Sequence, residues 1–142
     1  MKLQTATRLG VYAVLDLAAS PLQARSVTEI AERRGVSVNH LSKVMRTLAA
    51  AGLVEGARGV GGGYRFVGNA KRLTLLEVIE LFEDPVGESS RILDAQLPDV
   101  PVLDQILREI DDVTRLTLDS ISIATMIRLS AELVVRQENN VQ

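Results

Sequence analysis

Cysteine and tryptophan are absent from this sequence of 142 residues. Without thiols, the chain cannot form a disulfide scaffold, a thiolate metal site or a cysteine nucleophile. Aromatic residues make up only 3% of the chain, although hydrophobic residues reach 46%. Leu, Val, Ile and Ala must therefore fill the core, and such a composition favours helices over a β-sandwich.

Long apolar runs are missing as well. The first ten residues lack the apolar segment of a secretory signal, and no run approaches the roughly 20 residues that a membrane span needs. The absence of thiols fits a reducing compartment. We therefore expect a cytoplasmic protein that has no membrane partner.

Residues that catalyse reactions or bind metals are also scarce. His40 is the only histidine, and no obvious triad supports it. The Asp and Glu residues fit solvated helix faces, and one histidine with scattered carboxylates does not make a metal site. We expect neither catalytic residues nor a metal, so an enzyme is not expected.

The net charge of −2 hides an asymmetry along the chain. Residues 1–72 carry 11 Lys and Arg against 4 Asp and Glu, a net charge of +7, whereas residues 73–142 carry 5 against 14, a net charge of −9. A basic segment joined to an acidic one indicates a module that binds a polyanion beside a module with another task. Chance segregation of surface charge is the alternative.

Residues 1–84 carry the pattern of a winged helix-turn-helix domain, in which three helices precede a β-hairpin. Ser26 and Ser37 are suitable N-caps, and Gly35 and Gly52 suit the left-handed position after a helix. Apolar periodicity and these end signals predict helices over residues 5–20, 26–35 and 37–51. Two short strands around a glycine-rich loop predict the hairpin, over residues 53–55 and 64–67.

The second half of the chain is expected to be helical with one interruption. Thr74 and Glu77 form a capping box that begins a fourth helix, and Pro85 ends it. Residues 85–101 hold three of the four prolines and show no periodicity, so we predict a loop or hinge there. The helices expected in this half cover residues 74–84, 102–119 and 123–136, followed by a frayed end.

One side of the long helix is apolar at the spacing of a helix–helix seam. A monomer would leave this stripe in water, so we expect the stripe to form a dimer interface. Packing against the chain's own N-terminal domain is the alternative. The residues of the stripe are Leu103, Ile106, Leu107, Ile110, Val113 and Leu116.

The polar side of the third helix is the first candidate DNA-binding surface. In a helix-turn-helix, the second helix of the motif enters the major groove, and its outward residues meet base edges. Asn39, Ser42 and Lys43 suit base edges, since Asn pairs well with adenine. His40 and Arg46 could bind phosphates on either flank. An ordinary solvated helix face is the alternative.

The glycine-rich hairpin is the second candidate surface. Arg58 lies at its tip, and a narrow tip could carry this side chain into the minor groove. Backbone N–H groups in the glycine-rich loop could donate to phosphate. A nucleotide-binding loop is disfavoured, because no Gly-Lys-Ser/Thr follows the glycines and no helix follows the hairpin directly. A flexible hairpin is the alternative. Together the two surfaces give the predicted DNA contacts Ser37, Asn39, His40, Ser42, Lys43, Arg46, Arg58, Gly62, Tyr64 and Arg65.

Three segments carry a specific resemblance: RLGVYAVLDLA, TEIAERRGVSVNHLSKVMRTLAAAGLVEGARGVGGGYRF and LTLLEVIE. They are similar to the IscR/NsrR (Rrf-two) family of bacterial winged-helix transcription regulators. The resemblance implies a homodimer in which the long helix crosses to the partner. It also implies DNA contacts by Asn39, Ser42 and the helix around them, with Arg58 as the wing arginine.

The chain departs from this family at its cofactor. Many members hold an iron–sulfur cluster through three cysteines in the loop before the long helix, and residues 85–101 contain none. Some members take a further ligand from an acidic residue in the first helix, where this chain has Arg8. We therefore expect no cluster and no other cofactor. Members of the family without a cluster respond to a small molecule or a protein effector, or to no signal at all, and these alternatives stay open for this chain.

The expected fold is mainly α. It comprises a winged helix-turn-helix domain at residues 1–84, a hinge at 85–101 in the place of the cluster-binding loop, and a dimerisation helix with a C-terminal helix at 102–142. The expected function is sequence-specific binding of double-stranded DNA by a homodimer that acts as a repressor on a dyad-symmetric operator. A winged-helix module that binds another protein through its acidic half is the alternative.

Overall fold

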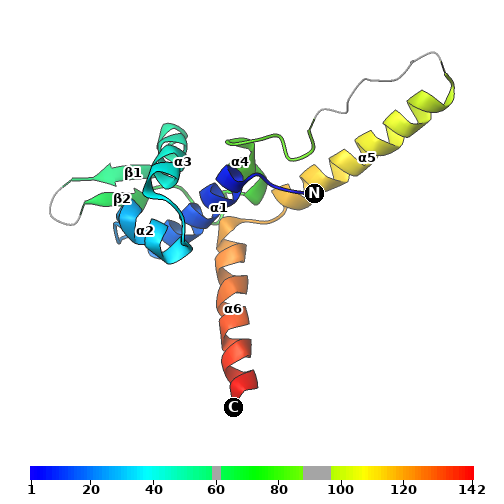
Figure 1. The fold of residues 1–142 in the computed structure, drawn as a ribbon. Helices are drawn as coiled ribbons and strands as arrows, with labels where there is room; N and C mark the ends of the chain where they lie inside the picture. The colour runs from blue at the N-terminus through cyan, green and yellow to red at the C-terminus, as the bar shows by residue number, and fades with distance from the viewer. Residues whose placement is uncertain (59–61, 88–96) are drawn as a thin grey trace.

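The computed structural model describes residues 1–58, 62–87 and 97–142 (Figure 1). Helices α1 to α4 and the hairpin β1–β2 gather at one end, and the long helices α5 and α6 project from it. The elements in chain order are α1 (Thr5–Ala18), α2 (Val27–Arg34), α3 (Val38–Ala50), β1 (Val54–Ala57), β2 (Gly63–Phe66), α4 (Leu75–Glu80), α5 (Asp99–Asp119) and α6 (Ile123–Val141). This order confirms the predicted winged helix-turn-helix and the mainly helical class.

Local end signals explain where the helices of the motif begin and end. Oγ of Ser26 accepts a hydrogen bond from the backbone N–H of Glu29 at 3.1 Å, and Oγ of Ser37 accepts one from that of His40 at 3.1 Å. Gly35 closes α2 with a φ of 66°, a left-handed conformation that glycine adopts without steric cost. These contacts confirm the predicted caps of α2 and α3.

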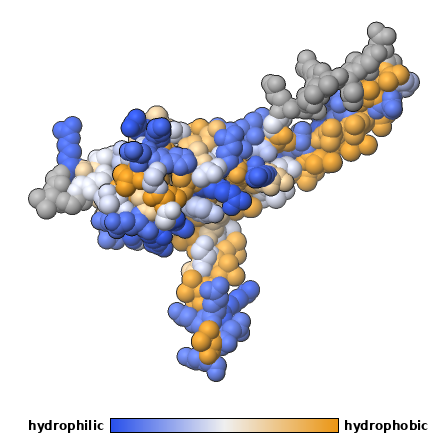
Figure 2. Space-filling model, in the orientation of Figure 1, coloured by the Kyte–Doolittle hydropathy of each residue, from blue (hydrophilic) through white to orange (hydrophobic). Residues whose placement is uncertain are grey.

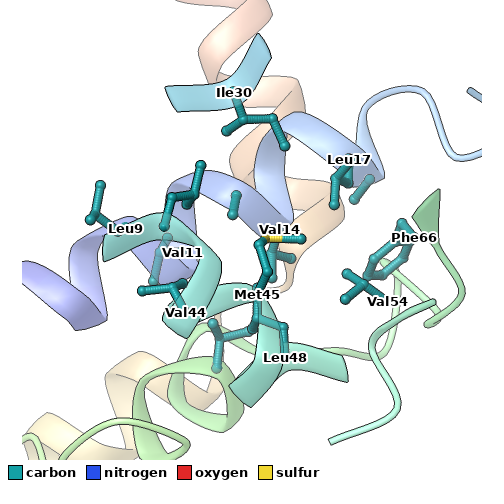
Figure 3. Close-up of a cluster of buried hydrophobic side chains, with 14 of the residues drawn as sticks. Leu9, Val11, Val14, Leu17, Ile30, Val44, Met45, Leu48, Val54 and Phe66 are labelled. Carbon is teal, nitrogen blue, oxygen red and sulfur yellow. The ribbon is translucent and has the colours of Figure 1, made fainter. Parts of the chain in front are cut away.

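The core lies between α1, α3 and the hairpin (Figure 3). Val14 and Leu17 of α1 form one cluster with Met45 of α3 and Phe66 of β2. The apolar side predicted for α3 is confirmed by exposed fractions of at most 2% at Leu41, Val44, Met45 and Leu48. Because α3 buries this side in the core, its opposite side faces outward and is available to contact a partner.

The hairpin pairs its strands antiparallel, with Val54 opposite Phe66. Both strands are displaced by one or two residues from the predicted ones. Leu53 lies outside β1 because its N–H still bonds to Leu48 O, at 3.1 Å, and completes the end of α3. The hairpin itself confirms the predicted wing.

Helix α4 ends at Glu80, so the prediction that it runs to residue 84 is wrong. Phe82 instead lies so close to Gly10 of α1 that a Cβ on this glycine would be 2.3 Å from the ring. Glu83 accepts a hydrogen bond from Oγ1 of buried Thr7, and another, 2.8 Å long, from the N–H of the residue before α1. Phe82 and Glu83 thus contact α1, and these contacts take the place of the last turn that was predicted for α4.

Both terminal helices are longer than predicted. α5 begins at Asp99 rather than at residue 102, because Pro101 is tolerated in a first turn, where its missing N–H needs no partner. α6 continues to Val141, so the predicted frayed end is wrong.

The corner between α5 and α6 is joined to the winged domain. Three backbone hydrogen bonds of 2.8–2.9 Å connect residues 121–124 at this corner with residues 70–75. Close by, Arg115 of α5 pairs with Glu80 at 2.7 Å and with Asp84 at 2.6 Å. The C-terminal end of α5 is therefore fixed to α4 and its flanks, while the rest of α5 extends away.

Candidate nucleic-acid interface

The outer face of α3 presents a row of polar and cationic side chains. Asn39, Lys43 and Arg46 are exposed and lie at i, i+4 and i+7, which places them on one face of the helix. We call these three residues the recognition row. α3 contains no Asp or Glu, so the helix itself does not offset the two positive charges.

Other predicted contacts on α3 are less open to a partner. Oγ of Ser37 is engaged in capping the helix, and Oγ of Ser42 donates to Val38 O at 2.7 Å. His40 is half-buried. The structure therefore leaves the recognition row as the most accessible part of the predicted surface on this helix.

The two predicted wing arginines differ in their surroundings. Arg58 is exposed, next to residues 59–61, which lie outside the described part of the chain. Arg65 lies opposite Glu55 in the strand pair, and its Nε donates to Glu55 Oε1 at 2.7 Å. This ion pair offsets the charge of Arg65, which makes Arg58 the stronger candidate for a DNA contact.

The base of the wing includes a residue that was not predicted. Arg25 and Tyr64 exchange two backbone hydrogen bonds, 2.9 and 2.8 Å long. Gly63 permits this approach, because a Cβ there would lie 2.3 Å from Arg25 O. Tyr64 and Gly62, both predicted DNA contacts, are half-buried at this base. The one sequence feature that could have pointed to Arg25 is its position directly before Ser26, the N-cap of α2.

A buried ion pair holds α2, the first helix of the motif, against α1. The Asp16 side chain is only 3% exposed and accepts hydrogen bonds from Arg34 Nη2 at 2.6 Å and Nε at 3.0 Å. The Arg34 guanidinium also lies 4.9 Å from the centroid of the Tyr12 ring. We call these three residues the α1–α2 clamp. A two-point pair fixes orientation as well as distance, so the clamp supports the geometry from which α3 projects.

The apolar stripe predicted on α5 is exposed in the single chain (Figure 2). Leu118 is the one buried residue of α5, a helix that is described over its whole length. This contradicts the alternative that the stripe packs against its own domain. Exposed fractions from 37% to 70% belong to Leu103, Ile106, Leu107, Ile110, Val113 and Leu116.

Residues 1–58, 62–87 and 97–142 contain no cluster of three His, Cys, Asp or Glu side chains that could hold a metal ion. Over the same ranges, no helix combines the length and the apolar character that crossing a membrane requires. Most of the predicted hinge, residues 88–96, lies outside the described part of the chain.

Comparison with known proteins identifies similar regulators. A family model described as "Rrf2: Iron-dependent Transcriptional regulator" matches residues 3–129. BadM of Rhodopseudomonas palustris, by name an HTH-type transcriptional regulator, is 44% identical over 129 residues, which are 91% of this chain and 83% of BadM. IscR of Cereibacter sphaeroides, named in the same way, is 35% identical over 90 residues, or 61% of this chain and 58% of IscR. The first similarity spans nearly the whole chain, and the second spans little more than half of either protein.

Solved structures of similar fold extend the likeness to the long helices. IscR of T. potens has a TM-score of 0.76 at 28% identity, and the match covers 94% of this chain and 90% of that one. CymR, the global cysteine regulator of B. subtilis, has a TM-score of 0.78 at 25% identity and covers 91% of this chain and 98% of its own. Coverage this high includes α5 and α6 as well as the winged domain.

Proposed function

This chain belongs to the Rrf2 family of transcriptional regulators, and we propose that it binds a dyad-symmetric operator as a homodimer and represses transcription there. As a member of this family, it is a DNA-binding transcription regulator. We assign DNA binding to the outer face of α3 because it presents the recognition row of Asn39, Lys43 and Arg46 on a helix free of acidic residues. A helix-turn-helix inserts this face into the major groove.

Each proposed contact suits the chemistry of its side chain. Asn39 reads an adenine through two hydrogen bonds, to N6 and N7. Lys43 and Arg46 bind phosphates beside it and fix the register of the helix. Arg58 carries a positive charge from the wing into the minor groove, where a narrow groove has the strongest negative potential.

A second copy of the chain is the proposed partner of the apolar stripe on α5. Six large apolar side chains along one side of a helix form a continuous apolar patch, whereas the apolar residues of an ordinary surface are scattered. Two copies related by a twofold axis would bury both stripes and present two recognition helices to two half-sites. Repression then needs only occupancy, because a dimer on the operator excludes other proteins. A regulator of this kind acts in the cytoplasm, binds no membrane and catalyses no reaction.

Replacing Asn39 by Ala should weaken binding to the preferred duplex by about 1–3 kcal/mol and relax the preference at one base pair, because only that pair loses its hydrogen bonds. Lys43→Ala should weaken binding to every duplex alike and lower the slope of log affinity against log salt by about one. The preferred duplex is obtained by selection from random sequences, and affinities are then measured over a salt series.

Arg136→Ala is the control for both variants. It removes one exposed positive charge from α6, which projects away from α3 (Figure 1), and should change neither preference nor slope. Unchanged binding in the Asn39 and Lys43 variants would exclude α3 from the interface. A wild type without preferred sequence or steep salt dependence would favour a winged-helix module that binds another protein through acidic residues 73–142.

The proposed regulator works without an iron–sulfur cluster. Such clusters are held chiefly by cysteine thiolates, and the whole sequence contains none, so a cysteine-bound cluster does not fit this chain although the family description names iron. A small molecule or a protein is the proposed effector.

Protein purified without oxygen should be colourless, and metal analysis should find no stoichiometric iron, because thiolate ligands are absent. A reproducible brown colour with about one or two iron atoms per chain would contradict this expectation. The ligands would then be other groups, such as His40, Gln96 or carboxylates.

A further inference from the structure

Arg25 is half-buried, and one nitrogen of its side chain has no hydrogen-bond partner among the described residues. Its Nε is buried and donates no hydrogen bond to any residue within the described ranges. Arg34, Arg65 and Arg115, by contrast, each bind a carboxylate. A buried cationic donor without an acceptor costs free energy, so packing alone does not account for Arg25.

The backbone fixes the point from which this side chain extends. Arg25 forms a single antiparallel bridge with Tyr64 and so lies beside β2, on the edge of the wing. A Cβ at Gly63 would lie 2.3 Å from the Arg25 carbonyl oxygen and 2.7 Å from Ser26 N. The wing base and the start of α2 are therefore packed backbone to backbone, and the Arg25 side chain originates at their junction.

This junction lies between two elements that approach DNA in a winged helix-turn-helix. The first helix of the motif crosses the phosphate backbone while the second enters the groove. Here that first helix, α2, begins directly after Arg25 with the Ser26 cap. A phosphate at the junction would meet a guanidinium group, whose planar fork of donors suits phosphate oxygens.

We propose that Arg25 binds a backbone phosphate of the operator between the wing and α2, and so positions the recognition row without reading sequence. The proposal rests on DNA binding through α3 and the wing, and it adds a residue that lies on neither α3 nor the wing tip. A phosphate oxygen supplies the acceptor that this side chain lacks. The contact therefore forms when DNA binds and contributes nothing to folding.

Arg25→Met is the decisive variant, because methionine keeps an apolar stem and removes the charged head. Affinity for the operator and for unrelated duplex should fall by the same factor, about tenfold, and the salt slope should drop by about one. The melting temperature should stay unchanged or rise, since a buried donor without an acceptor is removed. Arg25→Lys should keep the slope because it keeps the charge.

Arg136→Met is the control, because it removes the same charge from exposed α6 and should change neither affinity nor slope. Wild-type affinity and slope in Arg25→Met would overturn the proposal. So would a fall of several degrees in its melting temperature, because Arg25 would then be a structural residue. If the wild type bound no duplex at all, the proposed function would fail instead, so the two failures are distinguishable.

Discussion

Replacing Ile110 by Asp should turn the proposed dimer into a monomer and lower the affinity for a two-half-site operator by about a hundredfold or more. Ile110 lies in the middle of the apolar stripe and is 55% exposed in the single chain. In the proposed dimer this position is buried against a second stripe, where an unpaired carboxylate is strongly unfavourable. A monomer engages one half-site and loses the gain of a linked pair, about 10²–10⁴-fold.

Sedimentation of wild type and Ile110→Asp at micromolar concentration measures this association, and circular dichroism shows whether the helices persist. Gln105→Glu is the matched control: it adds the same charge at an exposed polar position of α5 and should leave the dimer intact. A monomeric wild type would contradict the proposed dimer. If the Ile110→Asp variant stayed dimeric, the dimer interface would have to lie elsewhere, for example at exposed Leu129 and Leu133 of α6.

Replacing Asp16 by Ala should lower the free energy of unfolding by about 3 kcal/mol, at the lower end of the range for breaking a buried ion pair. The lower end applies because the Asp16 side chain is 3% exposed while that of Arg34 is 29% exposed and keeps some water. Without the carboxylate, Arg34 remains partly buried without its acceptor, and α2 loses its attachment to α1. The melting temperature should fall by roughly 10 °C in a chain of this size.

Glu132→Ala is the matched control for this loss. Glu132 binds Arg128 in an exposed i,i+4 pair of 2.9 Å, and such pairs stabilise by only about 0.3–0.5 kcal/mol. Denaturant unfolding is measured at one fixed protein concentration, because the stability of a dimer depends on concentration. Equally small losses in both variants would show that the α1–α2 clamp does not hold α2.

Local rules were sufficient to predict the helix-turn-helix and the wing. The Ser26 and Ser37 caps need only a side-chain oxygen and the N–H three residues later, and the capping box of Thr74 and Glu77 is equally local. The polar row on α3 follows from the helical period alone. In each of the three helix caps, both interacting groups lie within one turn of each other in the sequence, and the wing was predicted from its glycine-rich turn.

Contacts between distant segments were beyond such rules. The sequence after Glu80 continues a helical pattern, yet Phe82 leaves the helix to pack on Gly10. Arg65 looks like a free cation until the strand register places Glu55 opposite it. The pairing of Arg25 with Tyr64, like the buried and unpartnered Nε of Arg25, depends on β2 lying beside it. Each of these partners is chosen by tertiary structure, which the order of residues along the chain does not display.

The hydrogen-bonded corner between α5 and α6 fixes one end of α5, so a small change of angle at this corner moves the other end of α5 by a much larger distance. With 21 residues at about 1.5 Å each, α5 is roughly 31 Å long. A tilt of about 6° at the corner would swing the far end by about 3 Å, close to the rise of one base pair, about 3.4 Å. In the proposed dimer, the stiffness of the bonds between residues 121–124 and 70–75 would therefore limit how far the spacing of the half-sites can depart from the spacing that the dimer fits.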